Sequence, residues 1–204
     1  MDSSRENLKV ASDEQLLAAF LSGDKPAFAS LVERYQRDLF QFLYRFLGDS
    51  AAADDVFQEA FIQVYQSAGQ FEIGRTFRPW LFTIAANKAR DYLRSRNRRQ
   101  SVSLQAAISP HSGNGHEYIE LLQSADPGPE SHLETDELRD RVMLAIQRLP
   151  EHLREVLLLA YFQQFPYKQI SETLKVPLGT VKSRLHAAVE AFANIWKSTN
   201  PAAS

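Results

Sequence analysis

Apolar residues recur at helical spacing through most of the chain, and no stretch alternates at a period of two over a useful length. In the first third this pattern predicts three helices. The first begins at Ser12 or Asp13, which are good N-cap residues. The second carries Pro26 in its first turn and ends at Gly48. The third covers about residues 51–67 and has a broad apolar stripe.

A fourth helix follows from Pro79 and ends in a dense run of cations near Arg99. Its apolar residues fall on one face at helical spacing. They are Trp80, Leu81, Ile84, Ala85, Ala89 and Leu93. The first half of the chain is therefore expected to form an all-α bundle.

The composition changes over residues 101–132, where Ser, Gly, Pro, His and acidic residues dominate. Such a composition is typical of a flexible linker. A second helical unit begins near Glu134 with a helix that stops at Leu149-Pro150, and another helix runs from Leu153 to Phe162. The predicted fold is all-α: two small helical domains, residues 1–100 and 133–204, joined by an acidic flexible linker.

The end of the chain has the pattern of a helix-turn-helix. A short helix over Tyr167–Leu174 is followed by a tight break at Lys175–Gly179 and a longer helix from Thr180. The first turns of the longer helix would present polar and basic side chains to a major groove. These are Thr180, Lys182, Ser183, Arg184 and His186. Short helical hairpins also occur without DNA, but the GTVKSR start favours nucleic-acid binding.

Charge is strongly segregated although the net charge is only −2. Residues 1–70 carry −5, residues 101–140 carry −7 and residues 141–204 carry +4. Between Arg75 and Arg99, eight cations face one acid, Asp91. Two basic regions separated by an acidic one suggest two contacts with one polyanion.

The basic helix is preceded by aromatic residues, among them Phe71 and Phe77. Flat side chains can stack on unstacked bases, and the cations lying off the apolar face can meet phosphates. A solvated helix end is the alternative, because cations there suit the helix dipole. Trp80 is expected to belong to the core rather than to a base platform.

The remaining composition excludes several classes. With no Cys, the chain has no disulfide framework, thiolate metal site or Cys nucleophile. The N-terminus lacks the pattern of a signal peptide, and no apolar run is long enough to span a bilayer. We expect a soluble cytoplasmic protein without membrane insertion, cofactor or metal.

Four segments in fixed order resemble the extracytoplasmic-function group of bacterial sigma factors, in the sigma-70 family. They are DDVFQEAFIQVY (54–65), FRPWLFTIAANKARDYLRSRNRR (77–99), LPEHLREVLLLAYFQQFPYKQIS (149–171) and VPLGTVKSRLHAAVEAF (176–192). The resemblance implies a subunit that binds bacterial core RNA polymerase and promoter DNA, directs transcription initiation and has no enzymatic activity of its own. Family members are commonly held inactive by an anti-sigma factor, so such a partner is implied too.

The resemblance assigns roles to particular residues. The patch that binds core polymerase maps onto Asp54, Asp55, Gln58 and Glu59. Recognition and melting of the minus-ten element map onto the loop from Gln70 to Thr76 and onto the basic helix. The residues implied there are Phe71, Arg75, Phe77, Arg78, Asn87, Lys88, Arg90, Arg94 and Arg98.

Recognition of the minus-35 element maps onto Thr180, Lys182, Ser183, Arg184 and His186. Many relatives continue with Arg-Ala-Arg, whereas this chain has Ala187-Ala188-Val189. Two phosphate-contacting cations are therefore missing, which predicts a weaker salt dependence of this contact.

Two rival functions remain open at this point. An ordinary helix-turn-helix regulator would explain residues 134–197 but would leave the basic helix over residues 71–99 without a role. An enzyme could use Asp54, Asp55 and Glu59 as a Mg²⁺ site. The sequence offers no second acidic motif, phosphate loop or nucleophile–base pair for it.

Overall fold

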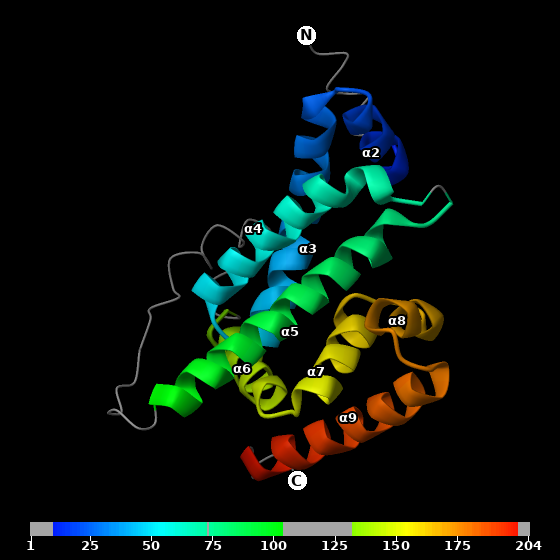
Figure 1. The fold of residues 1–204 in the computed structure, drawn as a ribbon. Helices are drawn as coiled ribbons and strands as arrows, with labels where there is room; N and C mark the ends of the chain where they lie inside the picture. The colour runs from blue at the N-terminus through cyan, green and yellow to red at the C-terminus, as the bar shows by residue number, and fades with distance from the viewer. Residues whose placement is uncertain (1–9, 73, 104–131, 200–204) are drawn as a thin grey trace.

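The computed structural model describes residues 10–72, 74–103 and 132–199, and within these ranges all regular structure is helical (Figure 1). The predicted all-α class is confirmed. Residues 104–131, almost all of the predicted linker, lie outside the described residues. None of the helices in the described ranges combines the length and apolar character that crossing a membrane requires.

Among its described residues the first unit has the following helices and a short 3₁₀ turn, and every predicted helix is present. They are α2 (Asp13–Leu21), α3 (Lys25–Leu47), α4 (Ser50–Ser67), η1 (Ala68–Gln70) and α5 (Phe77–Ser103). Ser12 caps α2 as predicted, because its hydroxyl accepts from the Gln15 N–H while the Gln15 side chain accepts from the Ser12 N–H. Gly48 ends α3 with a φ of 75°, a left-handed conformation that glycine adopts without strain.

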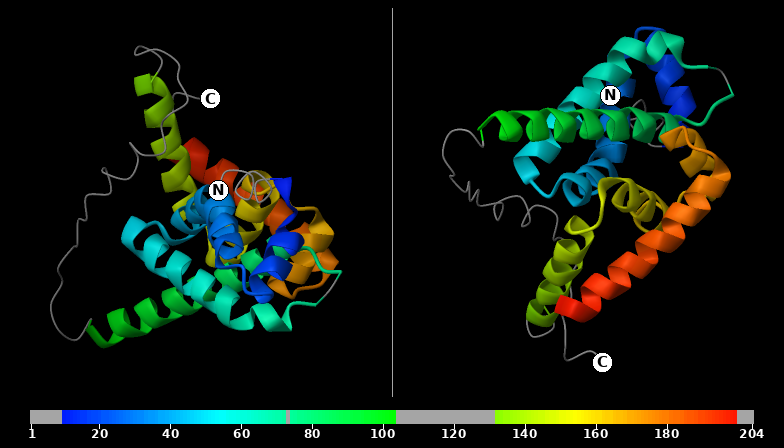
Figure 2. Two further views of the ribbon diagram at one scale, coloured as in Figure 1. Left: turned by 90° about the horizontal axis from the view of Figure 1, so that it is seen from above. Right: turned by 60° about the horizontal axis from the view of Figure 1, so that its bottom comes forward.

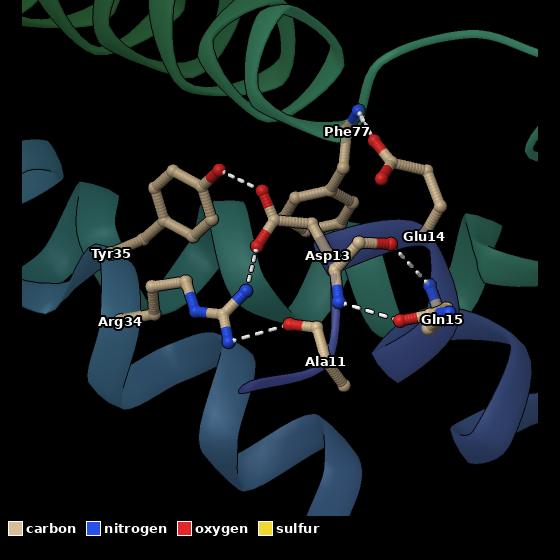
Figure 3. A network of polar contacts seen from close by, with 8 residues as sticks. Ala11, Asp13, Glu14, Gln15, Arg34, Tyr35 and Phe77 are labelled. Carbon is tan, nitrogen blue, oxygen red and sulfur yellow. Dashed lines mark hydrogen bonds and ion pairs between the residues drawn. The ribbon is translucent and has the colours of Figure 1, made fainter. Parts of the chain in front are cut away.

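Helix α5 begins at Phe77, two residues before the predicted start at Pro79. The Glu14 carboxylate of α2 accepts a hydrogen bond of 2.9 Å from the Phe77 N–H, so a distant side chain caps the basic helix (Figure 3). Beside it, Arg34 donates to Asp13 at 2.5 Å and to the Ala11 carbonyl at 2.9 Å. These contacts fix α2, α3 and α5 relative to one another.

The second unit contains α6 (His132–Gln147), α7 (Glu151–Leu157), η3 (Leu158–Phe162), α8 (Tyr167–Leu174) and α9 (Leu178–Thr199). One continuous helix was expected from Leu153 to Phe162. Instead, the α-helix ends at Leu157 and the chain continues as a π-helical turn, η3. The bounds of α8 are those predicted.

The two units pack against each other through a continuous apolar core. The Phe82 ring of α5 lies 5.3 Å from that of Phe42 in α3 and 5.2 Å from that of Phe165, just before α8. Both views in Figure 2 show α8 beside the N-terminal half of α5. The sequence pattern identified two separate units but not this packing.

A buried arginine reinforces the junction. The guanidinium of Arg154 in α7 donates to four oxygens: the Phe46 carbonyl at 2.6 Å, the Gln147 side chain at 2.9 Å, the Gln147 carbonyl at 2.5 Å and the Leu149 carbonyl at 2.9 Å. Burial lowers the pKa of Arg154, yet these bonds compensate the buried charge. Arg154 thereby joins the ends of α3 and α6.

The cap on α5 predicts a pH-dependent contribution to stability. Burial alone would raise the pKa of Glu14, but hydrogen bonds, the one from the Phe77 N–H foremost, lower it overall. Because the folded-state pKa lies below the unfolded one, the charge of Glu14 stabilises the fold above the unfolded pKa. That stabilisation is lost as the pH falls through the folded pKa.

Urea unfolding should therefore show Glu14→Gln to be less stable than wild type at about pH 7, by about 1 kcal/mol, with the gap closing towards about pH 3. A gap that stays constant over this range would contradict the ionic cap. Glu33→Gln, an exposed position on α3, is the control and should change little at either pH.

Substitution of Arg154 by Lys should be strongly destabilising, since one ammonium group cannot satisfy four oxygens arranged around a planar fork. We expect a loss of about 2–4 kcal/mol in the free energy of unfolding. Arg148→Lys, at the exposed position directly after α6, should change the free energy of unfolding by less than about 0.5 kcal/mol. Equal effects in urea unfolding would refute this role for Arg154.

Candidate nucleic-acid interface

Helix α5 presents two contrasting faces. Leu81, Ala85, Ala89 and Leu93 are buried, and this apolar face fixes the rotation of the helix about its axis. The cations then lie off the core, as predicted, and most of them face an acid or an acceptor. Lys88 lies 3.7 Å from Glu59, Arg94 lies 2.9 Å from Asp91, and Arg75 in the preceding loop lies 2.7 Å from Glu72.

Asn87 and Arg90 act together at the centre of α5. The Arg90 guanidinium donates to the Asn87 side-chain oxygen at 2.5 Å, and its other terminal nitrogen lies 3.7 Å from the Glu155 carboxylate of α7. Both side chains are half-buried. The Asn87 amide is thus oriented by an arginine of its own helix.

The aromatic residues before and at the start of α5 form one cluster. The ring of Trp80 lies 5.0 Å from that of Phe71 and 5.8 Å from that of Phe77. Phe77 is fully buried, and Phe71 and Trp80 pack against the core with part of their surface accessible. Of the two phenylalanines assigned to DNA, only Phe71 has surface that a base could reach in this arrangement.

A shallow cationic groove lies between α5 and the start of α7. Its lining consists of Arg90, Arg94, Asn97, Arg98 and Glu151. Arg94 and Arg98 are exposed, and both are residues assigned to DNA. Arg78 differs, because it is engaged by residues of the second unit; Gln163 accepts from its guanidinium through two oxygens at 3.0 Å each.

The residues assigned to polymerase lie on the outer side of α4. Asp55, Gln58 and Glu59 are exposed and line a hollow with Ile62, opposite Tyr92, Arg96 and Arg99 of α5. Asp54 is half-buried and lies outside this lining; burial, and then the neighbouring charge of Asp55, raise its pKa. Among the described residues, no three His, Cys, Asp or Glu side chains form a group that could hold a metal ion.

Helices α8 and α9 form the predicted helix-turn-helix. Ile170, Leu174, Val181 and Leu185 are buried between them. Lys175 ends α8 in the left-handed region with a φ of 54°, and the Ser171 hydroxyl donates to the Val176 carbonyl at 2.6 Å. These contacts set the angle of the tight turn.

The five residues assigned to the minus-35 element divide into two groups. Lys182, Ser183 and His186 are exposed on α9, whereas Thr180 and Arg184 are half-buried. Arg184 faces inwards, 3.9 Å from the same Glu155 oxygen that Arg90 approaches. In this arrangement three of the five are open to a partner.

Comparison with known proteins accounts for both units. Residues 31–99 match the model of Sigma-70 region 2, and residues 139–192 match that of Sigma-70, region 4. The chain is 37% identical over 185 residues to the RNA polymerase sigma-H factor of Pseudomonas aeruginosa, covering 91% of this chain and 94% of that protein. The chain belongs to the sigma-70 family.

Other sigma-70 relatives agree. The ECF RNA polymerase sigma factor SigW of Bacillus subtilis is 35% identical over 170 residues, covering 83% of this chain and 89% of that protein. The ECF sigma-E factor of Escherichia coli is 33% identical over 183 residues, covering 90% and 93%. The resemblance to the extracytoplasmic-function group is confirmed.

Solved structures support the fold of this sigma factor. CnrH, in complex with the cytosolic domain of CnrY, superposes with a TM-score of 0.65 at 22% identity, covering 92% of this chain and 99% of that one. RpoE of Bartonella quintana, in complex with the anti-sigma factor NepR, gives the same TM-score at 21% identity, with 83% and 96% covered.

The sequence did not predict the role of four residues at the junction of the two units of this sigma factor. Arg154, Glu155, Gln163 and Phe165 all lie where the second unit meets the first, and all are buried. Arg154 and Glu155 are adjacent charges within the apolar run LREVLLLA. This pattern could have indicated a buried polar contact, because buried charges need partners. Nothing in the sequence identified Gln163.

Proposed function

We propose that this sigma-70 family protein is a promoter-specificity subunit of bacterial RNA polymerase. It binds the core enzyme, recognises the minus-35 and minus-ten elements, and melts the minus-ten DNA, without a reaction of its own. The observation that carries the proposal is the presence of both sigma regions, in order, along a chain that matches sigma factors over nearly its whole length. Its place of action is the cytoplasm, where polymerase meets promoter DNA.

Core polymerase would bind the outer side of α4. Asp55, Gln58 and Glu59 are exposed there beside Ile62, which is 56% exposed. A polar rim around an exposed aliphatic side chain is typical of a protein-binding surface. Asp54, the fourth residue of the set, is half-buried at the edge of this surface.

The minus-ten DNA would bind along α5. Unstacking a base costs a few kcal/mol, and the half-buried ring of Phe71 together with the Asn87 amide can compensate part of this cost. Arg94 and Arg98 are exposed and would contact the backbone. The cations that are paired with acids in this structure would exchange those acids for phosphates; they are Arg75, Lys88, Arg90 and Arg94. Phe77 supports this surface from the core instead of touching DNA.

The minus-35 element would bind the first turns of α9. Lys182, Ser183 and His186 are exposed at the start of the second helix of the helix-turn-helix. Thr180 and Arg184 complete the set, Arg184 after leaving Glu155. Two structural neighbours were solved with CnrY and with the anti-sigma factor NepR, and we extend a partner of this anti-sigma kind to the present chain.

Run-off transcription with core polymerase on promoters selected from the source genome tests the proposal. Asn87→Ala should lower transcript yield at least about tenfold by removing base capture, with core binding intact. Glu59→Ala should weaken core binding as well, whereas Glu33→Ala, on an exposed part of α3, should match wild type. Absence of transcripts, combined with tight operator binding by the protein alone, would favour the helix-turn-helix regulator instead.

Salt dependence tests the minus-35 surface separately. In holoenzyme bound to promoter DNA, Lys182→Ala should reduce the slope of log affinity against log salt by about 0.9, the loss of one phosphate contact. Lys197→Ala, at the exposed far end of α9, should leave the slope unchanged. If the slope of Lys182→Ala equalled that of Lys197→Ala, the DNA would not bind at the first turns of α9.

A further inference from the structure

The last turns of α5 carry polar side chains on two different sides of the helix. Tyr92, Arg96 and Arg99 follow one another at spacings of four and three residues, and Arg90 and Arg94 are also four residues apart. Residues at these spacings share one side of a helix. The first set lies towards α4, which runs beside α5 (Figure 1), whereas the second lies towards the start of α7. The basic run of the sequence therefore divides into two surfaces.

The surface towards α4 is a hollow of about 700 Å³ with charges of both signs on its walls. Helix α4 contributes two acids, an amide and an aliphatic side chain, and α5 contributes a phenol and two guanidinium groups. We call it the α4–α5 hollow. Its lining consists of Asp55, Gln58, Glu59, Ile62, Tyr92, Arg96 and Arg99. The two acids and the two arginines leave it without net charge.

The opposite charges of this hollow face each other without pairing across it. Among the described residues, the cation that pairs with Glu59 is Lys88, at 3.7 Å, and Arg99 donates to the Ser95 hydroxyl of its own helix at 3.1 Å. The buried Nε of Arg96 has no hydrogen-bond partner in the described part of the chain. An incompletely satisfied guanidinium gains free energy when a bound partner supplies acceptors.

The charges on the walls favour a protein over nucleic acid as the occupant of the hollow. Phosphates brought to its arginines would also approach Asp55 and Glu59, and like charges at such short range repel. The groove on the other side of α5 is different, because three arginines outnumber its single acid, Glu151. A polyanion therefore suits that groove, whereas a protein segment can present both signs of charge to the hollow.

The hollow is continuous with the surface of α4 that the proposed function gives to core polymerase. Ile62, which is 56% exposed, belongs to both. A matching segment would place an aliphatic side chain on Ile62, a basic side chain beside the acids of α4, and carboxylate or carbonyl oxygens beside Arg96 and Arg99. Such a mixed surface is typical of protein interfaces, where arginine and tyrosine are enriched.

We propose that the whole α4–α5 hollow is a binding site for core polymerase, so that Tyr92, Arg96 and Arg99 of the basic helix contact the polymerase and not the promoter. The identity of the partner rests on the proposed function. The division of α5 into two surfaces rests on the lining of the hollow and of the groove alone.

Two double variants of the same helix test this division. Arg96→Ala with Arg99→Ala removes both cations of the hollow, and Arg94→Ala with Arg98→Ala removes two cations of the groove. The change in net charge is identical in the two, so each is the matched control of the other. The affinity of the full-length chain for purified core polymerase is measured without DNA. The salt dependence of promoter binding is then measured with core polymerase at saturation.

We expect Arg96→Ala with Arg99→Ala to weaken core binding at least about tenfold and to leave the slope of log affinity for promoter against log salt unchanged. The other pair should keep wild-type core affinity and reduce that slope by up to about 1.8, the loss of two phosphate contacts. Far-UV circular dichroism identifies a variant that has unfolded. Arg99→Glu, at an exposed position, should keep the fold and weaken core binding more than Arg99→Ala, because it adds a third acid to the hollow.

The inference is overturned if folded Arg96→Ala with Arg99→Ala and Arg99→Glu bind core polymerase as tightly as wild type. It is also overturned if removal of Arg96 and Arg99 reduces the salt slope as much as removal of Arg94 and Arg98, since both pairs would then contact DNA. Failure of the proposed function has a different signature: wild type itself would not bind core polymerase, and the inference would fail with it.

Discussion

The arrangement of the two helical units depends on one row of aromatic rings. Phe82 packs between Phe42 on one side and Phe165 on the other, and the three rings make the two apolar cores continuous. Aromatic contacts of this kind contribute both buried area and preferred ring geometry. The cation of Arg78, over the rings of Phe82 and Phe165, adds a polar component, because it also donates to two oxygens of Gln163.

Several cations near this junction have two possible partners, namely DNA and groups of the chain itself. A guanidinium that can bind a phosphate can equally bind a carboxylate or a carbonyl within the chain. Arg78, Arg90 and Arg184 each contact groups of the chain itself in this structure. Exposed ion pairs exchange partners at little cost, so Lys88 and Arg94 can pass to DNA readily. Arg78 is held by Gln163 and Phe165 of the second unit, so its release requires a movement of that unit.

The sequence predicted the elements well, because helix period, caps and the αL glycine are local properties. Ser12, Gly48 and the short helix Tyr167–Leu174 were found where local chemistry placed them. Contacts between distant segments were not predictable in this way. Glu14 capping Phe77 joins residues 63 apart, and Gln163 bonding to Asp38 joins residues 125 apart. Neither bond leaves a periodic signal.

In the candidate site, too, local features could be predicted from the sequence, whereas contacts between distant segments could not. Exposure of Asp55, Gln58 and Glu59 followed from their place on the polar side of an amphipathic helix, and the polar start of α9 followed from the turn before it. The sequence did not predict the burial of Phe77, because an aromatic residue at the start of a helix can belong to the core or to the surface. Only the three-dimensional packing of Phe71, Phe77 and Trp80 separates these roles.

The most direct test of the account is the distance between the two units in wild type, measured with spin labels on α5 and α9 by pulsed electron resonance. We predict one short distance in the free chain and one longer by tens of ångströms once the chain is bound to core polymerase and promoter DNA, in keeping with elements roughly 70 Å apart. The same distance in both states would contradict the proposed binding of two separate promoter elements by one chain. A free chain that already shows the long distance would contradict the packing of the two units through one apolar core.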